Sequence, residues 1–173
     1  MAIAVNVSAI ELRSKDFLDH TTKVLRDTGL DPRYLELELT ESILMRHAPS
    51  TVDVLQALRS LGVTIAIDDF GTGYSSLTYL RQFPVDVLKV DQSFIHEVTT
   101  AAGGSPIVSA MISMGRSLGH RVIAEGVETP EQYAFLRMQE CSEGQGYYFS
   151  RPLPADQLMA SWAADSSGVF LRA

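Results

Sequence analysis

Six short apolar, β-branched runs alternate in this sequence with longer segments that have helical periodicity. The runs are residues 2–7, 35–39, 63–67, 85–90, 121–124 and 146–149. Strands that alternate with helices are typical of βα units, in which successive strands lie parallel in one sheet. The sequence therefore predicts an α/β fold with a parallel sheet.

Capping signals between the runs predict five helices. We expect them at residues 14–29, 50–62, 106–119, 130–138 and 155–163, with N-caps at Ser14, Ser105 and Thr129 and with Ser50 preceding the second helical segment. Gly29 and Gly62 stand where C-caps belong, and Thr129 with Gln132 forms a capping box. The chain has no low-complexity segment or linker, so we expect no internal domain boundary.

Acidic or amide side chains accompany nearly every strand run. They are Asn6, Glu38, Glu41, Asp68, Asp69, Asp91, Glu125 and Glu128, with Gln145 just before the last run. The carboxyl ends of parallel strands meet at one edge of the sheet, where functional groups gather. One such acid is more often a helix cap or a turn residue. Acids at consecutive strand ends repel one another unless cations or bound protons neutralise them, so the pattern favours a metal site.

Oxygen ligands for that site are expected from Asn6, Glu38, Asp68 and Asp69, with Asp91 and Glu125 as further candidates. Oxygen-only ligand sets select hard cations, so Mg²⁺ or Mn²⁺ is expected ahead of Zn²⁺. The adjacent Asp68 and Asp69 suit a pair of ions, which at a separation of ~4 Å clamps the attacking and leaving oxygens of a phosphoryl displacement.

Lys89 lies two residues before Asp91, so both side chains point to the same side of their strand. One interpretation is that the ammonium orients the attacking water or neutralises charge on phosphate. The other is a structural ion pair between Lys89 and Asp91. Spacing alone leaves both open.

The glycine-rich segment 69–76 also has two interpretations, a nest of backbone N–H groups that binds phosphate and a loop that gates the site. Walker and dinucleotide-binding patterns are absent from the sequence. The four histidines fall away from the strand ends, which argues against histidine-based or zinc chemistry.

Composition narrows the function classes. The 14 Lys and Arg against 21 Asp and Glu, a net charge of −7, make binding to nucleic-acid polymer unexpected, because such binding depends on basic side chains that neutralise phosphates. Cys141, the single cysteine of the sequence, excludes an internal disulfide and favours a cytoplasmic location. The sequence has no apolar run near the ~20 residues that a membrane span needs.

Six motifs together resemble the EAL-domain phosphodiesterases that linearise cyclic di-GMP. They are NVS at 6–8, ELTES at 38–42, DDFGTGYSSL at 68–77, LKVD at 88–91, AEGVET at 124–129 and QGYYFSRP at 145–152. The resemblance covers essentially the whole chain in order, and it implies a TIM-barrel-like (β/α) fold with the site at the carboxyl ends of the strands.

The resemblance also implies roles for individual residues. It implies metal ligation by Asn6, Glu38, Asp68 and Asp69, with Asp91 and Glu125 completing the metal and water shell of a two-metal Mg²⁺ or Mn²⁺ site. Lys89 would position the nucleophilic water and Glu125 would be the general base. Glu41 resembles the residue that anchors the DDFGTG loop, and Glu128 and Gln145 resemble contributors to the ligand pocket. Members of the family often form homodimers.

The sequence departs from the family in one respect, because it contains no Glu-Ala-Leu tripeptide. In the family the Glu of that motif is a metal ligand on the first strand. We therefore expect residues 1–173 to be a partial EAL domain with about six of the eight strand units, starting at the third strand. Impaired hydrolysis is expected for this chain, with a non-catalytic module that binds cyclic di-GMP or a protein as the alternative. An incomplete barrel exposes strand edges, which favours a homodimer or pairing with another chain.

Overall fold

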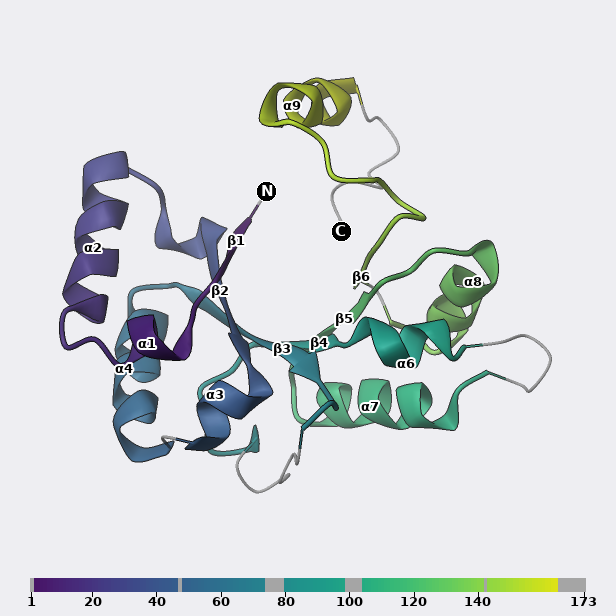
Figure 1. Ribbon diagram of the computed structural model, residues 1–173, viewed down its shortest axis with the longest axis horizontal. Helices are drawn as coiled ribbons and strands as arrows, with labels where there is room; N and C mark the ends of the chain where they lie inside the picture. The colour runs from purple at the N-terminus through teal and green to yellow at the C-terminus, as the bar shows by residue number, and fades with distance from the viewer. Residues whose placement is uncertain (1, 47, 74–79, 99–103, 142, 165–173) are drawn as a thin grey trace. The chain divides into compact units, whose positions relative to one another are not determined.

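The computed structural model describes residues 2–46, 48–73, 80–98, 104–141 and 143–164 (Figure 1). They form two compact units, one of Met1–Leu88 with Leu118–Arg121 and one of Lys89–Ser117 with Val122–Ala173. Six strands follow one another in sequence order in the sheet. They are β1 (Ile3–Asn6), β2 (Leu35–Thr40), β3 (Thr64–Phe70), β4 (Val87–Val90), β5 (Arg121–Glu125) and β6 (Glu143–Gln145).

In the first unit, parallel pairing aligns the ends of the first three strands. Asn6 of β1 lies opposite Glu38 of β2, and Thr40 of β2 lies opposite Asp68 of β3. Successive side chains of a strand point to opposite faces, so Leu37 and Leu39 share one face of β2 and Glu36 and Glu38 share the other. All four of these side chains are buried, so β2 is covered on both faces.

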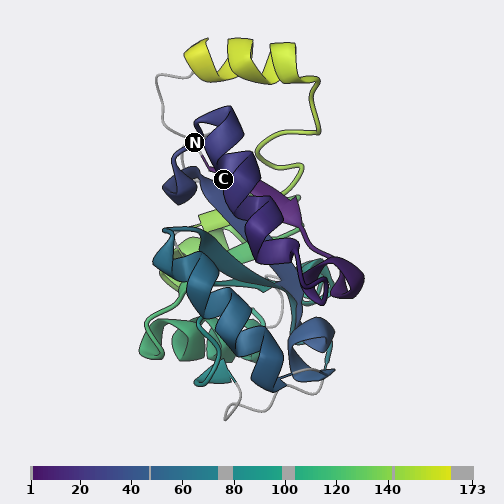
Figure 2. The same cartoon turned by 90° about the vertical axis from the view of Figure 1, so that its left-hand side faces the viewer.

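Helices of the first unit pack on its strands. They are α1 (Ala9–Leu12), α2 (Phe17–Thr28), α3 (Glu41–Arg46) and α4 (Ala48–Ser60), with a 3₁₀ turn η1 (Pro32–Tyr34). Helix α4 contacts β3 and α2, and α3 contacts β2 and β3 (Figures 1 and 2). Leu55 and Leu58 of α4 are completely buried, as is Ile65 of β3. The covering layer therefore depends on leucines at helical spacing.

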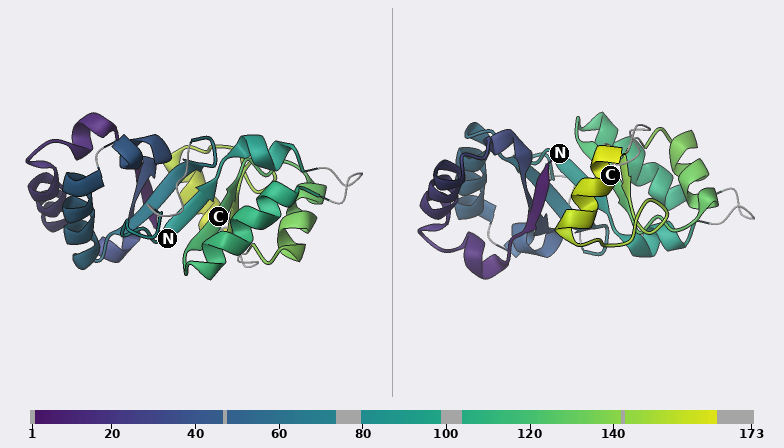
Figure 3. Two further views of the ribbon diagram at one scale, coloured as in Figure 1. Left: turned by 90° about the horizontal axis from the view of Figure 1, so that it is seen from below. Right: turned by 90° about the horizontal axis from the view of Figure 1, so that it is seen from above.

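In the second unit, three helices surround a separate core. They are α6 (Gln92–His96), α7 (Pro106–Ser117) and α8 (Pro130–Met138), and α6 contacts α7 (Figures 1 and 3). One hydrophobic cluster joins Ile95 of α6, Val108 and Ile112 of α7, Phe135 of α8 and Ala124 of β5. The last helix is α9 (Ala155–Ala164). Among helices in the described part of the chain, none has the length and apolar character of a membrane span.

Five of the six expected strands are confirmed to within three residues at each end, and the last is wrong. The strand is Glu143–Gln145, and residues 146–149 form a turn in which Phe149 N–H donates to Gly146 O at 3.1 Å. The apolar content of residues 147–149 reflects ring packing, because Tyr133 stacks on Tyr148 at 5.1 Å and meets Phe149 edge-on. Gln145 consequently ends a strand instead of preceding one.

The expected starts of two helices are also wrong. Helix α2 begins at Phe17 after Asp16, and Ser14 forms the turn before it, its carbonyl accepting from Phe17 N–H. Helix α4 begins at Ala48, so residue 50 lies inside it. Pro49 favours this earlier start, because proline is tolerated in the first helical turn. The remaining caps are confirmed, with Gly29 left-handed at φ 69° after α2 and a complete capping box at Thr129.

Candidate active site

Four predicted ligands lie at or near the aligned ends of β1, β2 and β3. Asn6 ends β1 and is exposed, whereas Glu38 on β2 is buried. Asp68 and Asp69 are half-buried near the end of β3, and each offers a carboxylate oxygen within 4.8 Å of the other's. The fold of the first unit therefore places an amide and three carboxylates at one edge, in the order that the sequence predicts.

Asp69 has a backbone conformation that residues other than glycine rarely adopt. Its φ is +53°, whereas most non-glycine residues are confined to negative φ. Aspartate tolerates this left-handed region better than most residues, at a cost of about 1–2 kcal/mol. The left-handed turn ends the regular strand at the carboxylate pair, where a functional site commonly stores such strain.

Glu41 connects this edge to the glycine-rich segment. Its side chain is only 3% exposed at the start of α3, and Oε2 accepts from the Gly71 N–H at 3.2 Å. A Cβ at Gly73 would lie 2.9 Å from Oε1 of Glu41, so a larger residue there would require the Glu41 carboxylate to shift. Glu41 thus holds residues 71–73, while residues 74–76 of the predicted loop lie outside the described residues.

Lys89 and Glu125 form the main ion pair of the second unit. Lys89 Nζ lies 2.7 Å from Glu125 Oε1, and the lysine side chain is almost fully buried on β4. One of the two interpretations that the sequence left open paired Lys89 with Asp91, and neither included this contact with the end of β5. The register between neighbouring strands determines which side chains form ion pairs across them, and the spacing of residues in the sequence does not predict that register.

Asp91 acts as a helix cap in the structure. Its Oδ1 accepts from the backbone N–H of Ser93 at 3.0 Å and from the Ser93 hydroxyl. These bonds cap the N-terminus of α6. Each carboxylate has a second oxygen, so capping leaves Oδ2 of Asp91 for another role. A helix cap is the structural role that the sequence analysis gave as the alternative to metal binding for any single strand-end acid. Ser93, which donates to this cap, was not predicted from the sequence.

The two predicted pocket residues, Glu128 and Gln145, lie on segments that follow β5 and end β6. Glu128 is exposed, with Oε1 3.8 Å from His96 Nε2 on α6. The backbone carbonyl of Gln145 accepts from the Val127 N–H at 3.0 Å, and the side chain of Gln145 is exposed. Both side chains are therefore accessible from solvent, as a ligand-contacting residue must be.

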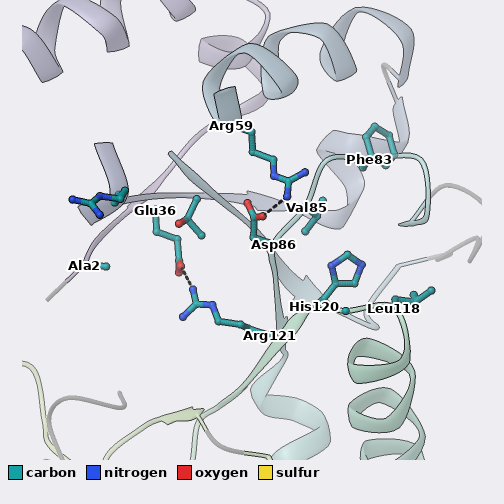
Figure 4. A pocket seen from close by; sticks show the side chains of 12 residues that line it. Ala2, Glu36, Arg59, Phe83, Val85, Asp86, Leu118, His120 and Arg121 are labelled. Carbon is teal, nitrogen blue, oxygen red and sulfur yellow. Dashed lines mark hydrogen bonds and ion pairs between the residues drawn. The ribbon is translucent and has the colours of Figure 1, made fainter. Parts of the chain in front are cut away.

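A hollow of about 700 Å³ lies at the opposite, amino-terminal ends of the strands in the first unit (Figure 4). Two ion pairs cross it, Arg121 to Glu36 at 2.7 Å and Arg59 to Asp86 at 2.9 Å. Burial lowers the pKa of His120 there, opposed by a hydrogen bond with the Val85 backbone and by Asp86. No sequence pattern predicts this hollow, because its lining residues belong to five separate segments.

The donor set at the carboxyl-terminal edge of the first unit fits a hard divalent cation. Its donors are carboxylate and amide oxygens, and the Asp68 and Asp69 oxygens are close enough to share a ligand sphere. Cys141 is buried with its thiol pKa raised to about 11 by desolvation, which suits neither a metal-bound thiolate nor a nucleophile.

Comparison with known proteins identifies the family. The EAL domain model matches residues 1–152. Cyclic di-GMP phosphodiesterase NbdA of Pseudomonas aeruginosa is 49% identical over 154 residues, which cover 89% of this chain and 20% of NbdA. This chain thus spans about a fifth of the length of that curated relative.

Solved structures agree. The phosphodiesterase PaMucR in complex with c-di-GMP superimposes with a TM-score of 0.86 at 44% identity, covering 91% of this chain and 64% of that one. Klebsiella pneumoniae BlrP1, solved in a manganese and cy-diGMP complex, has a TM-score of 0.78 at 34% identity over 87% of this chain and 39% of its own. These likenesses confirm the predicted TIM-barrel-like (β/α) fold, here with six strands and so incomplete. The chain belongs to the EAL domain family.

Proposed function

We propose that this chain is part of a domain that hydrolyses one phosphodiester of cyclic di-GMP to give linear pGpG. The observation that carries the proposal is the carboxylate pair Asp68 and Asp69 at the end of β3, beside the end of β2 with its buried Glu38. Family membership and the ligands named for PaMucR and NbdA support the choice of substrate. We also propose that residues 1–173 all belong to this partial EAL domain.

The proposed cation ligands are Asn6, Glu38, Asp68 and Asp69, with Asp91 and Glu125 completing the shell. We propose Mg²⁺ or Mn²⁺, in a two-metal site, because the donors are all hard oxygens and BlrP1 was solved with manganese. A divalent cation at such a site supplies Lewis-acid stabilisation of charge on the phosphate and lowers the pKa of water.

Lys89 and Glu125 are the proposed catalytic groups. Glu125 accepts a proton from the attacking water as that water forms a bond to phosphorus and the bond to the leaving ribose oxygen breaks. The Lys89 ammonium, 2.7 Å from Oε1, holds this carboxylate in orientation and offers positive charge to the phosphate oxygens. Glu41 anchors the glycine-rich loop, and Glu128 and Gln145 contribute contacts to the nucleotide.

A second candidate function is a non-catalytic module that binds cyclic di-GMP or a protein partner. The sequence observation in its favour is that these 173 residues contain no Glu-Ala-Leu tripeptide, whose Glu is a metal ligand in the family. Without that ligand the cation site would be weaker, and the proposed hydrolysis depends on the cation. Impaired hydrolysis with retained binding therefore remains our prediction for this chain.

Association with another chain, as a homodimer or by pairing, is also proposed. All four residues of β1 are exposed, among them Ile3 and Val5, and an exposed apolar strand favours association. Cytoplasmic location is proposed because the single cysteine is free.

The test combines binding and turnover on the 173-residue chain. Titration with cyclic di-GMP in Ca²⁺ measures binding, and pGpG release in Mg²⁺ or Mn²⁺ measures hydrolysis. Asp68→Ala and Glu38→Ala should each weaken binding by tenfold or more, on the order of the loss for a removed metal-site residue, whereas Asp19→Ala on the exposed side of α2 should not. No binding by the parent chain would refute both hydrolysis and a module that binds cyclic di-GMP, and would leave only binding to a protein partner. Hydrolysis at a rate typical of enzymes, about 1–1000 s⁻¹, would refute the predicted impairment.

A further inference from the structure

The segment 126–129, which joins β5 to α8, packs directly against α6. Gly126 has φ +70°, and a Cβ built on it would lie 2.5 Å from Cβ of Gln92, the first residue of α6. The two backbones thus approach more closely than any side chain at position 126 allows. Segment 126–129 follows Glu125 and includes Glu128, and α6 follows Asp91, so this contact joins two sets of proposed site residues.

Gln132 supplies the hydrogen bonds across this contact. Its side chain is 95% buried, that is, only 5% exposed. Oε1 accepts from the Glu128 N–H at 2.7 Å and from the Thr129 N–H at 3.1 Å. Nε2 donates to the Ile95 carbonyl of α6 at 3.1 Å. One buried amide therefore binds both segments at once.

The donor half of that amide is not needed for helix capping. A capping box requires only an acceptor at its fourth position, and glutamate serves there as well as glutamine. A negative charge in the first helical turn would even favour α8, by about 0.3–1 kcal/mol. The bond from Nε2 to Ile95, 37 residues earlier in the sequence, thus has a use other than starting the helix.

We propose that Gln132 is a positioning residue, whose buried amide fixes α6 and Asp91 relative to Glu125 and Glu128. The proposal rests on the proposed function, since it concerns the residues that would hold the cation and the nucleotide. Gln132 contacts neither ligand itself. It acts through the backbone at Glu128 and Ile95.

Two substitutions separate capping from positioning. Gln132→Glu keeps the acceptor for Glu128 and Thr129, but it turns a carboxylate oxygen toward the Ile95 carbonyl. Gln132→Ala removes both halves. Glu131→Gln, at the exposed neighbouring position of the same helical turn, is the control.

Amide hydrogen exchange in the full 173-residue chain is the readout that needs no ligand. In Q132E the amides of Phe94 and Val98 in and after α6 should exchange faster, while those of Glu128 and Thr129 keep their protection. In Q132A all four should exchange faster, and in E131Q none should. Unchanged exchange at Phe94 and Val98 in Q132E would overturn the proposal.

Affinity for cyclic di-GMP in Ca²⁺ is the second readout. Q132E should bind about 10- to 100-fold more weakly, as for loss of other groups that orient metal-site ligands, and E131Q should match the parent. The ratio of Q132E to parent affinity should rise toward one between about pH 8 and pH 5.5, because a protonated carboxyl donates to Ile95 again. The ratio for Q132A should stay flat. His96, Glu128, Asp91 and the Lys89–Glu125 pair are common to all variants, so their titration cancels in the ratios.

The outcomes are distinguishable. A parent chain that binds no cyclic di-GMP refutes the proposed function, and the exchange data then decide alone whether Gln132 fixes α6. A Q132E variant with faster exchange in α6 and parental affinity refutes positioning while leaving the proposed function intact. Equal pH dependence in Q132E and Q132A also refutes it, because a lost cap has no donor for acid to restore.

Discussion

Asp86 completes the sheet at the start of β4, and its removal should cost far more stability than its surface position suggests. Its backbone N–H donates to the Ile65 carbonyl at 2.9 Å, and its side-chain Oδ2 accepts from the Ile65 N–H at 3.0 Å. Asp86 also pairs with Arg59 at 2.9 Å, as Figure 4 shows. The side chain thus stands in for a strand partner of a completely buried residue.

Asp86→Ala leaves the buried Ile65 N–H without its acceptor, which costs about 1–3 kcal/mol. Loss of the ion pair adds about 0–1 kcal/mol, because the Arg59 side chain is 47% exposed and solvent screens it. The two losses together should cost about 1–4 kcal/mol, with the middle of that range at about 2.5 kcal/mol. Asp86→Asn keeps an acceptor for Ile65 and loses only the ion pair, so it should cost about 1 kcal/mol or less, as should Arg59→Met.

Urea unfolding of the three variants, followed by circular dichroism, measures these free energies. With a urea dependence of about 1–3 kcal/mol per M, Asp86→Ala should lower the unfolding midpoint by about 1 M or more. Equal losses in Asp86→Ala and Asp86→Asn would refute the reasoning, because the backbone bond would then contribute nothing. A loss in Arg59→Met as large as that in Asp86→Ala would refute it too, by assigning the effect to the ion pair.

Three further predictions concern other parts of the molecule. His120→Gln should flatten the pH dependence of stability below about pH 6.5. Burial lowers the pKa of His120 in the folded chain, so the unfolded chain binds more protons as the pH falls, and the stability that the neutral His120 contributes above its ordinary pKa of 6.5 is then lost. Urea unfolding midpoints of parent and variant between about pH 5 and 7.5 would detect the difference. Gly126→Ala should destabilise the chain by about 1–3 kcal/mol more than Gly29→Ala, since the two glycines have φ values of 70° and 69° but only Gly126 meets a neighbour; equal losses in urea unfolding would contradict this. Lys89→Met should cost about 3–5 kcal/mol, and a double-mutant cycle with Glu125→Gln should give a coupling of at least about 0.5 kcal/mol; additive losses would argue against the pair.

Local sequence signals predicted the elements that depend on local chemistry. Thr129 and Gln132 form their capping box, and Gly29 ends α2 in the left-handed conformation, because each feature needs only residues within one helical turn. The short helices α1, α3 and α6 were not predicted. Four to six residues are too few for hydrophobic periodicity to emerge.

The sequence predicted where the acidic side chains lie along the strands but not which side chains pair across neighbouring strands. The acids do lie at strand ends, because the alternation of strands and helices already determines where each strand stops. The partner of Lys89 was missed because it is set by which strand lies next to β4. The role of Gln132 toward Ile95 was missed for the same reason, since a bond across 37 residues leaves no periodic trace.

At Asp69 the residue that best suits the left-handed backbone differs from the residue that the proposed cation site needs. Glycine adopts φ +53° without the cost that aspartate bears, so replacement of Asp69 by glycine should make the chain more stable while removing a proposed ligand. A laboratory library sorted only for thermal resistance would accordingly drift toward glycine at residue 69. Aspartate should persist there only under selection that includes the ligand.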